Sequence, residues 1–320
     1  MNFPDRVRVV EVGPRDGLQS LQETYPTAVK VEMVEALAGA GLEKIEVTGF
    51  VRPEVIPQLA DAEELLAQVQ RFDGCVYRAL VPNRRGAERA VASGVDELVG
   101  LITASETYNS KNQNMTVDEN LAAISSIAQV GAGAGIPVVA AIGIAMFCPY
   151  EGDVPPARVL ALIERMRADG IDEVYLATSV GLDGPLAVHD LASRIVDCWP
   201  DLTLGLHLHD TNGMALANAL AGLDAGVTVF EGSICGIGGG IRMPYGMPHF
   251  GNVATEDLVH VFAEAGVETG SISRLCLRPR ARSRSSSDSR RPSAPPCGAE
   301  PSSTSSSSAG SHRMKARTGP

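Results

Sequence analysis

Residues 7–12 read Val-Arg-Val-Val-Glu-Val, a run rich in β-branched residues that ends directly before Gly13-Pro14-Arg15-Asp16. Such runs are typical of buried strands, and similar ones recur along the chain. Those that we interpret as strands span residues 7–12, 44–48, 76–81, 97–102, 137–142, 173–178, 203–207 and 228–231. Because the runs are nearly continuous in apolar residues, they favour strands that are covered on both faces.

Segments with helical spacing of apolar residues lie between these runs, for example at 29–40 and 158–168. Several end in a glycine just before the next strand, as at Gly41, Gly170 and Gly226, which is a common helix stop. Eight strand–helix alternations predict a (β/α)8 TIM barrel over residues 1–272. A doubly wound sheet is the competing α/β fold, but it usually has a glycine-rich first turn, and residues 11–15 do not form one.

Composition narrows the class of protein. The chain has 320 residues, of which 44% are hydrophobic and 4% aromatic, so the core is expected to be aliphatic. The formal net charge is −11, which argues against a nucleic-acid-binding protein. No basic-then-apolar signal precedes the first run, and the longest apolar stretch, 132–149, is interrupted by glycines and Pro137. We therefore expect a cytoplasmic protein with no membrane partner.

The C-terminal segment, residues 273–320, has a different composition. It is rich in Arg, Ser and Pro, and it lacks the periodicity of the rest of the chain. Such a segment cannot bury enough apolar surface to offset its ordering entropy. Two explanations stay open: a natural disordered tail, and a translational frameshift that replaced a terminal helix.

Polar side chains gather where a barrel has its active site, at the carboxyl ends of strands. His207 and His209 are two residues apart at the end of a strand, so both imidazoles point to one face. With Asp16 after the first strand and Asn252 after the last, they would form a mixed nitrogen and oxygen site for a divalent metal. The alternative for an isolated His-X-His is one hydrogen-bonded core residue and one exposed residue.

Arg15 and Glu46 form a second candidate group. An Arg beside a metal is a fixed cation that can stabilise negative charge developing on a carbonyl oxygen. Glu46 lies in an otherwise apolar run and needs a partner, and pairing with Arg15 is the simplest arrangement. The alternative is a purely structural salt bridge at the end of the barrel.

Five ordered motifs resemble the hydroxymethylglutaryl-CoA lyase family. They are Val10-Glu-Val-Gly-Pro-Arg-Asp-Gly-Leu-Gln19, Glu46-Val-Thr-Gly-Phe-Val51, Cys148-Pro-Tyr-Glu-Gly152, Leu206-His-Leu-His-Asp-Thr211 and Gly251-Asn-Val-Ala-Thr-Glu-Asp-Leu258. The resemblance implies a TIM barrel that binds Mg2+ or Mn2+ and cleaves an acyl-CoA substrate by a retro-aldol reaction. It also implies a place in leucine degradation and a possible homodimer.

The resemblance carries roles over to individual residues of this sequence. It implies that the metal ligands are Asp16, His207, His209 and Asn252. Arg15 would stabilise the enolate, with Glu46 supporting it. Gln19, in the first motif, is a substrate-binding candidate. Arg242 is a second candidate on general grounds and not from the resemblance, because Arg often binds carboxylates or phosphates, and a solvated loop residue is at least as plausible.

Two positions depart from the family pattern. The lyases carry a catalytic Cys in a glycine-rich lid, where this chain has Gly240, and an Asp after the sixth strand, where it has Thr178. Cys235 is nearby, and we interpret it as a buried structural thiol rather than a replacement. The glycine run 236–240 is expected to need unusual backbone angles.

These departures leave several functions open. The first is cleavage of 3-hydroxy-3-methylglutaryl-CoA to acetoacetate and acetyl-CoA, or of a relative such as citramalyl-CoA. The second is a Claisen-condensing acyltransferase of the same superfamily. The third is a metal-binding barrel whose catalysis has decayed, because a lost general acid or base typically costs about 10²–10⁴-fold in rate.

Overall fold

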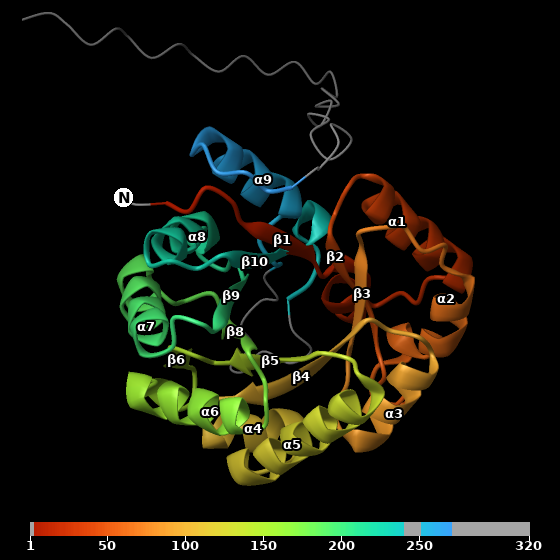
Figure 1. Cartoon of the computed structure of the whole chain (residues 1–320), viewed down its shortest axis with the longest axis horizontal. Coiled ribbons are helices and arrows are strands. Elements are labelled where there is room, and N and C mark those ends of the chain that lie inside the picture. Colours follow the sequence, from red (N-terminus) through yellow and green to blue (C-terminus); the bar gives the residue numbers. More distant parts are fainter. Residues whose placement is uncertain (1–2, 240–250, 271–320) are drawn as a thin grey trace, which may run out of the picture. The chain divides into compact units, whose positions relative to one another are not determined.

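The computed structural model describes residues 3–239 and 251–270, and within them the predicted TIM barrel is confirmed. Eight parallel strands close in the order β1-β10-β9-β8-β5-β4-β3-β2, and the helices surround them (Figure 1). The strands are β1 (Arg8–Glu11), β2 (Lys44–Gly49), β3 (Val76–Leu80), β4 (Glu97–Thr103), β5 (Val138–Gly143), β8 (Glu173–Thr178), β9 (Thr203–Leu208) and β10 (Val229–Gly232). Each falls on one of the predicted runs. The segment 273–320 lies outside the described residues, so its prediction stays open.

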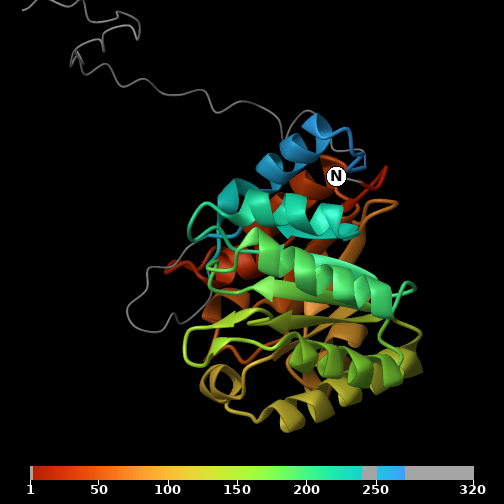
Figure 2. The same cartoon turned by 90° about the vertical axis from the view of Figure 1, so that its left-hand side faces the viewer.

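The helices follow the strands in the expected alternation and run along the outside of the barrel (Figure 2). They are α1 (Thr27–Gly39), α2 (Ala62–Gln68), α3 (Arg84–Ala92), α4 (Glu106–Gln113), α5 (Val117–Ala134), α6 (Pro156–Ala168), α7 (Pro185–Cys198), α8 (Ala215–Asp224) and α9 (Thr255–Glu264). A short antiparallel pair, β6 (Phe147–Cys148) and β7 (Gly152–Asp153), follows β5. Within the described ranges, no helix is long and apolar enough to cross a membrane.

Local sequence signals explain the helix ends. Thr116 accepts the backbone N–H of Glu119, whose side chain accepts the N–H of Thr116, so a capping box starts α5. The glycines predicted to stop helices, Gly41, Gly170 and Gly226, all adopt positive φ angles.

The interior of the barrel contains two kinds of side chain. Towards its axis, small aliphatic residues pack around Tyr175, among them Val10, Val99 and Val229. Charged side chains are buried there as well, namely Lys44, Glu46, Arg78, Glu97 and Glu231. The sequence analysis singled out only Glu46, so the buried charge is more extensive than predicted.

Gly205 on β9 marks a close approach inside the barrel. A Cβ atom at this position would lie 2.4 Å from the ring of Tyr175, which is fully buried. The ring therefore occupies space that any other residue at 205 would need. By contrast, a Cβ at Gly133, near the end of α5, would meet no atom within 4 Å.

We expect Gly205→Ala to lower the free energy of unfolding by about 1–3 kcal/mol, because the added methyl group forces Tyr175 from its packing. Gly133→Ala is the matched control and should raise stability by about 0.5–1 kcal/mol through helix propensity. Urea unfolding of both variants measures these differences. Equal effects of the two changes would contradict the packing described for Tyr175.

Candidate functional site

A short wide helical turn after β1 carries Arg15 and Asp16 into the mouth of the barrel. It spans Gly13–Gly17, and all five of its residues are buried. The carbonyl oxygen of Val12 accepts the backbone N–H groups of Arg15, Asp16 and Gly17 at 3.1, 2.7 and 3.2 Å. This convergence fixes the turn, so both side chains have a defined direction.

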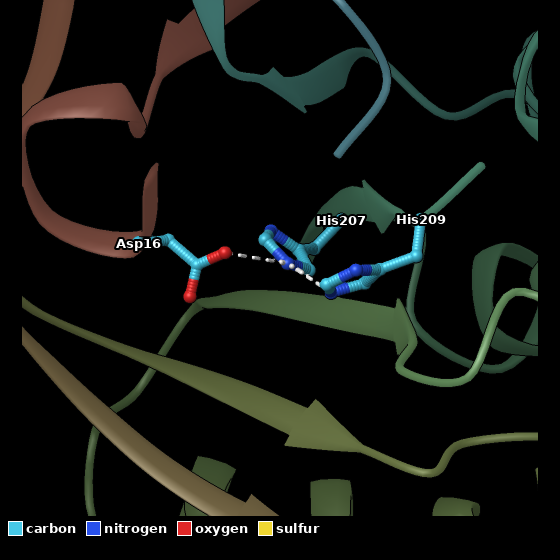
Figure 3. Close-up of side chains that lie close together, drawn as sticks. All are labelled: Asp16, His207 and His209. Atoms are coloured by element: carbon cyan, nitrogen blue, oxygen red, sulfur yellow. Dashed lines mark hydrogen bonds and ion pairs between the residues drawn. The ribbon is translucent and has the colours of Figure 1, made fainter. Parts of the chain in front are cut away.

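Asp16, His207 and His209 meet at the carboxyl end of the barrel (Figure 3). The Nε2 atoms of the two imidazoles are 3.1 Å apart, and His207 Nε2 is 4.0 Å from Asp16 Oδ2. One potential ligand atom from each residue lies within 4.8 Å of the others, and all three side chains are buried. The prediction that both imidazoles point to one face is confirmed, and the alternative of one exposed His is wrong.

Asn252 completes the group but with its nitrogen turned towards the carboxylate. Its Nδ2 donates to Asp16 Oδ2 at 2.8 Å and to the carbonyl oxygen of Ile237 at 3.1 Å. Its Oδ1 is buried and accepts no hydrogen bond from any described residue. A buried amide oxygen without a hydrogen-bond donor, on a residue that contacts the acid, is a candidate neutral ligand for a cation.

Surrounding charges set the protonation of the group. Burial favours neutral Asp16, but the Arg15 guanidinium and the two imidazoles outweigh it, and they hold the pKa of this carboxyl well below its usual range. Burial also favours neutral His207, yet its hydrogen bond to Glu231 and the charge of Asp16 raise its pKa above the ordinary value. Asp16 is thus a carboxylate at neutral pH.

Arg15 and Glu46 pair as predicted. Arg15 Nε donates to Glu46 Oε1, and Arg15 Nη1 donates to Asp16 Oδ1 at 2.7 Å. Glu46 is fully buried from bulk solvent. Together with Arg15, it lines a cavity at the mouth of the barrel. The pair therefore bridges the barrel end and also faces the space where a ligand would sit.

This cavity has a volume of about 710 Å³, within the range of small-molecule sites. Its walls include the three residues of the acid–imidazole group, and aliphatic residues such as Leu80 and Leu101. Gln19 lines it too, and its Nε2 donates to Asp16 Oδ1 at 2.6 Å. Arg242, the other predicted substrate-binding residue, lies outside the described residues, as does Gly240.

Of the two positions that depart from the family pattern, the structure describes Thr178. Thr178 is fully buried, and its Oγ1 accepts the backbone N–H of His209 at 3.1 Å. The interpretation of Cys235 as a buried thiol is wrong: it is exposed, in the turn Ile234–Gly236, where it adopts a φ of 58°. Gly236 and Gly238 adopt the positive φ angles expected of the glycine run.

Two site residues were missed by the sequence analysis. Glu231 Oε2 lies 2.7 Å from His207 Nδ1, and Arg78 contacts both Glu231 and Glu46. The charge of Arg78 outweighs the burial of Glu231 and lowers the pKa of this carboxyl to about 2. Both residues interrupt apolar strand runs, as Glu46 does, so the signal that identified Glu46 could have identified them.

A closed parallel barrel with a buried acid–imidazole group facing a large cavity defines a TIM-barrel enzyme with a candidate metal site. Residues 6–275 match the HMGL-like family, and the chain belongs to it; it is a carbon–carbon lyase by class. A mitochondrial hydroxymethylglutaryl-CoA lyase of Bos taurus is 41% identical over 268 residues, which cover 84% of this chain and 82% of that protein.

Solved structures agree with this assignment. A hydroxymethylglutaryl-CoA lyase of Pseudomonas aeruginosa matches with a TM-score of 0.82 and 36% identity, over 87% of this chain and 91% of that one. An HMG-CoA lyase of Acinetobacter baumannii, in complex with coenzyme A and 3-methylmalate, matches with a TM-score of 0.79 and 33% identity. That match covers 87% of this chain and 89% of the other.

Glu11 connects the turn that carries Asp16 to the segment that carries Asn252. Its Oε1 accepts the N–H groups of Gly13 and Ile234 at 2.6 and 2.9 Å, and its Oε2 accepts the Thr255 hydroxyl at 2.6 Å. Complete burial raises the pKa of Glu11 to about 7, although these three hydrogen bonds lower it in part.

The folded state therefore holds the Glu11 proton more tightly than the unfolded chain, where the ordinary pKa is 4.5. This contribution to stability is complete below pH 4.5 and is lost as the pH rises through about 7. Glu11→Gln cannot ionise; its amide oxygen can accept the Gly13 and Ile234 N–H groups, and its amide nitrogen can donate to the Thr255 hydroxyl oxygen. We expect its stability relative to the parent protein to rise by about 2 kcal/mol between pH 5 and pH 8.

Urea unfolding at the two pH values measures this difference, with the exposed Glu264→Gln as control. A difference that does not change with pH would show that Glu11 is ionised throughout.

Proposed function

We propose that the chain cleaves 3-hydroxy-3-methylglutaryl-CoA to acetoacetate and acetyl-CoA, in a reaction that depends on Mg2+ or Mn2+. The observation that carries the proposal is the buried acid–imidazole group, whose ligand atoms lie within 4.8 Å of one another and which Asn252 contacts through Asp16. Its position in the wall of the 710 Å³ cavity gives a substrate access to it.

The residues present fit a divalent cation. Asp16, His207 and His209 would hold it, and Asn252 would add a neutral oxygen once its amide turns Oδ1 in place of Nδ2 towards Asp16. Carboxylate, imidazole and amide ligands suit Mn2+ well and Mg2+ less so. When bound, such an ion acts as a Lewis acid that polarises substrate oxygens and lowers the pKa of a hydroxyl group.

The side chains of this chain then have separate tasks. In the retro-aldol step a base takes the proton of the tertiary hydroxyl, whose oxygen becomes the ketone of acetoacetate as the bond between C2 and C3 breaks. The electron pair of that bond passes to the thioester as an enolate. Arg15, fixed by Glu46, faces the cavity and can stabilise the negative charge that develops on the thioester oxygen. Protonation of the enolate carbon gives acetyl-CoA. Thr178 has no ionisable group at neutral pH, so neither proton transfer is assigned to it.

The acyl-CoA substrate is supported by the relative that binds coenzyme A and by the shape of the cavity. Its outer wall comes from the end of α4 and the loop after it, including Asn112, Asn114 and Met115, above an aliphatic floor. We propose that the thioester lies on this floor with Gln19 at its side. Dimerisation, the cytoplasmic location and a place in leucine degradation stay predictions.

Purified protein should release acetyl-CoA from 3-hydroxy-3-methylglutaryl-CoA when Mg2+ or Mn2+ is present, and a chelator should stop it. His207→Ala removes a ligand and should lower the rate by more than about 100-fold, since loss of a residue behind a ligand already costs 10–100-fold. Citramalyl-CoA is assayed in parallel, because Gly240 and Thr178 depart from the family pattern.

Release from citramalyl-CoA alone would replace the proposed substrate. Metal binding without release from either substrate would favour a condensing reaction or a decayed site.

Gly240→Cys tests the departure in the glycine-rich segment. A thiol at this position would supply a proton-transfer group, and such groups contribute about 10²–10⁴-fold. We expect kcat for 3-hydroxy-3-methylglutaryl-CoA to rise at least about 10-fold. Gly240→Ser is the control, because a hydroxyl of similar size does not ionise in the assay range. Equal kcat values for the two variants would show that this chain does not need the thiol.

A further inference from the structure

Arg78 lies completely buried in the interior of the barrel and contacts carboxylates from different strands. Its Nη2 donates to Glu231 Oε1 and lies 2.7 Å from Glu46 Oε2. Its Nη1 is 3.9 Å from Glu97 Oε1, and its guanidinium carbon is 5.0 Å from the centre of the Tyr175 ring. Arg78 does not line the cavity, so it does not touch a ligand bound there.

Glu46 and Glu231 each use one carboxylate oxygen to contact Arg78 and the other to contact a residue of the candidate site. Glu46 presents Oε2 to Arg78 and accepts from Arg15 with Oε1. Glu231 accepts from Arg78 with Oε1 and contacts His207 Nδ1 with Oε2 at 2.7 Å. Each carboxylate therefore joins the same guanidinium to a different residue of the candidate site.

The strand order explains how the one long side chain of Arg78 contacts both Glu46 and Glu231. Arg78 on β3 pairs in register with Glu46 on the adjacent β2, whereas Glu231 pairs with His207 on β9. Between β3 and β10 lie β2 and β1, so Arg78 reaches Glu231 through the interior rather than along the sheet. A guanidinium can face two carboxylates at once, whereas the single ammonium of Lys is a point charge.

We propose that Arg78 is a positioning residue that fixes the Arg15 side of the site relative to the His207 side. This inference rests on the proposed function. A carboxylate that contacts the second nitrogen of a metal-binding imidazole sets the orientation of the ring, and Arg78 holds that carboxylate in place. The same guanidinium supports the carboxylate that orients Arg15, so both halves of the site depend on one buried cation.

Lys44 provides the comparison that separates a positioning role of Arg78 from a general contribution to the stability of the barrel. It is buried to a similar degree and pairs with Glu97 at 2.7 Å and Glu173 at 3.0 Å. Neither carboxylate contacts Arg15, Asp16 or a site imidazole in the described structure. Glu97 also lies 3.9 Å from Arg78, so removal of Lys44 perturbs the same buried charges but removes no hydrogen bond to Arg15, Asp16 or a site imidazole.

The test compares Arg78→Met with Lys44→Met in the full chain. Mn2+ binding to metal-free protein is measured by calorimetry, Tm by thermal unfolding, and kcat and KM by acetyl-CoA release. We expect Arg78→Met to weaken Mn2+ binding by about 10–100-fold and to lower kcat more than it changes KM. Lys44→Met should lower Tm but leave the Mn2+ affinity within about 3-fold of the parent value.

A folded Arg78→Met protein with the parent Mn2+ affinity and kcat would overturn the inference, whatever its Tm. So would an equal loss of Mn2+ affinity in Lys44→Met. If Arg78→Met does not fold, the double variant Arg78→Met/Glu97→Gln decides, because it removes one buried charge of each sign and keeps both carboxylates that contact the site. Parent Mn2+ affinity in the double variant overturns the inference, and a loss of 10-fold or more supports it.

The same measurements on the parent protein show whether a failure belongs to this inference or to the proposed function. If it neither binds Mn2+ nor releases acetyl-CoA, the proposed function fails and the inference fails with it. If the parent binds and reacts while the Arg78 variants match it, only the role of Arg78 is wrong.

Discussion

The candidate site depends on the pairing of charges that the barrel seals from water. An ionised side chain in the interior is costly unless an opposite charge and hydrogen bonds compensate it. Here the buried cations Arg78 and Lys44 are matched by carboxylates on β2, β4, β8 and β10. Because each contact has a fixed direction, the pairs that make burial tolerable also orient the residues above them.

The kind of side chain in the barrel interior thus changes along the barrel axis. Aliphatic side chains and Tyr175 fill its axis, the charge pairs of Arg78 lie among them, and the acid–imidazole group faces the cavity at the carboxyl end. The segments that carry the group are also joined. The Glu11 carboxylate ties the turn after β1 to Ile234 and Thr255, and a backbone bridge pairs His209 with Asn252.

The features that could be predicted from the sequence are those that local patterns of residues determine. Strand positions, helix stops, the shared face of His207 and His209, and the Arg15–Glu46 pair all follow from spacing and from the need to pair a buried charge. The contact of Arg78 with Glu231 does not, because it joins strands far apart in the sequence through the closed interior. The exposure of Cys235 depends on one backbone angle, and the orientation of the Asn252 amide depends on its neighbours. No pattern in the chain encodes these.

Thr178 bears on the charge of the site. Arg15 is shared between Glu46 and Asp16, and Arg78 between Glu46 and Glu231, so Asp16 is the one carboxylate within the acid–imidazole group. An Asp at 178 would add a second negative charge beside His209, whereas the Thr178 hydroxyl holds the His209 backbone without charge. A divalent cation bound by one carboxylate and neutral ligands keeps a net positive charge. On the proposed function, Thr178 therefore leaves the site with more net positive charge to attract the oxygens of its substrate than an Asp at this position would.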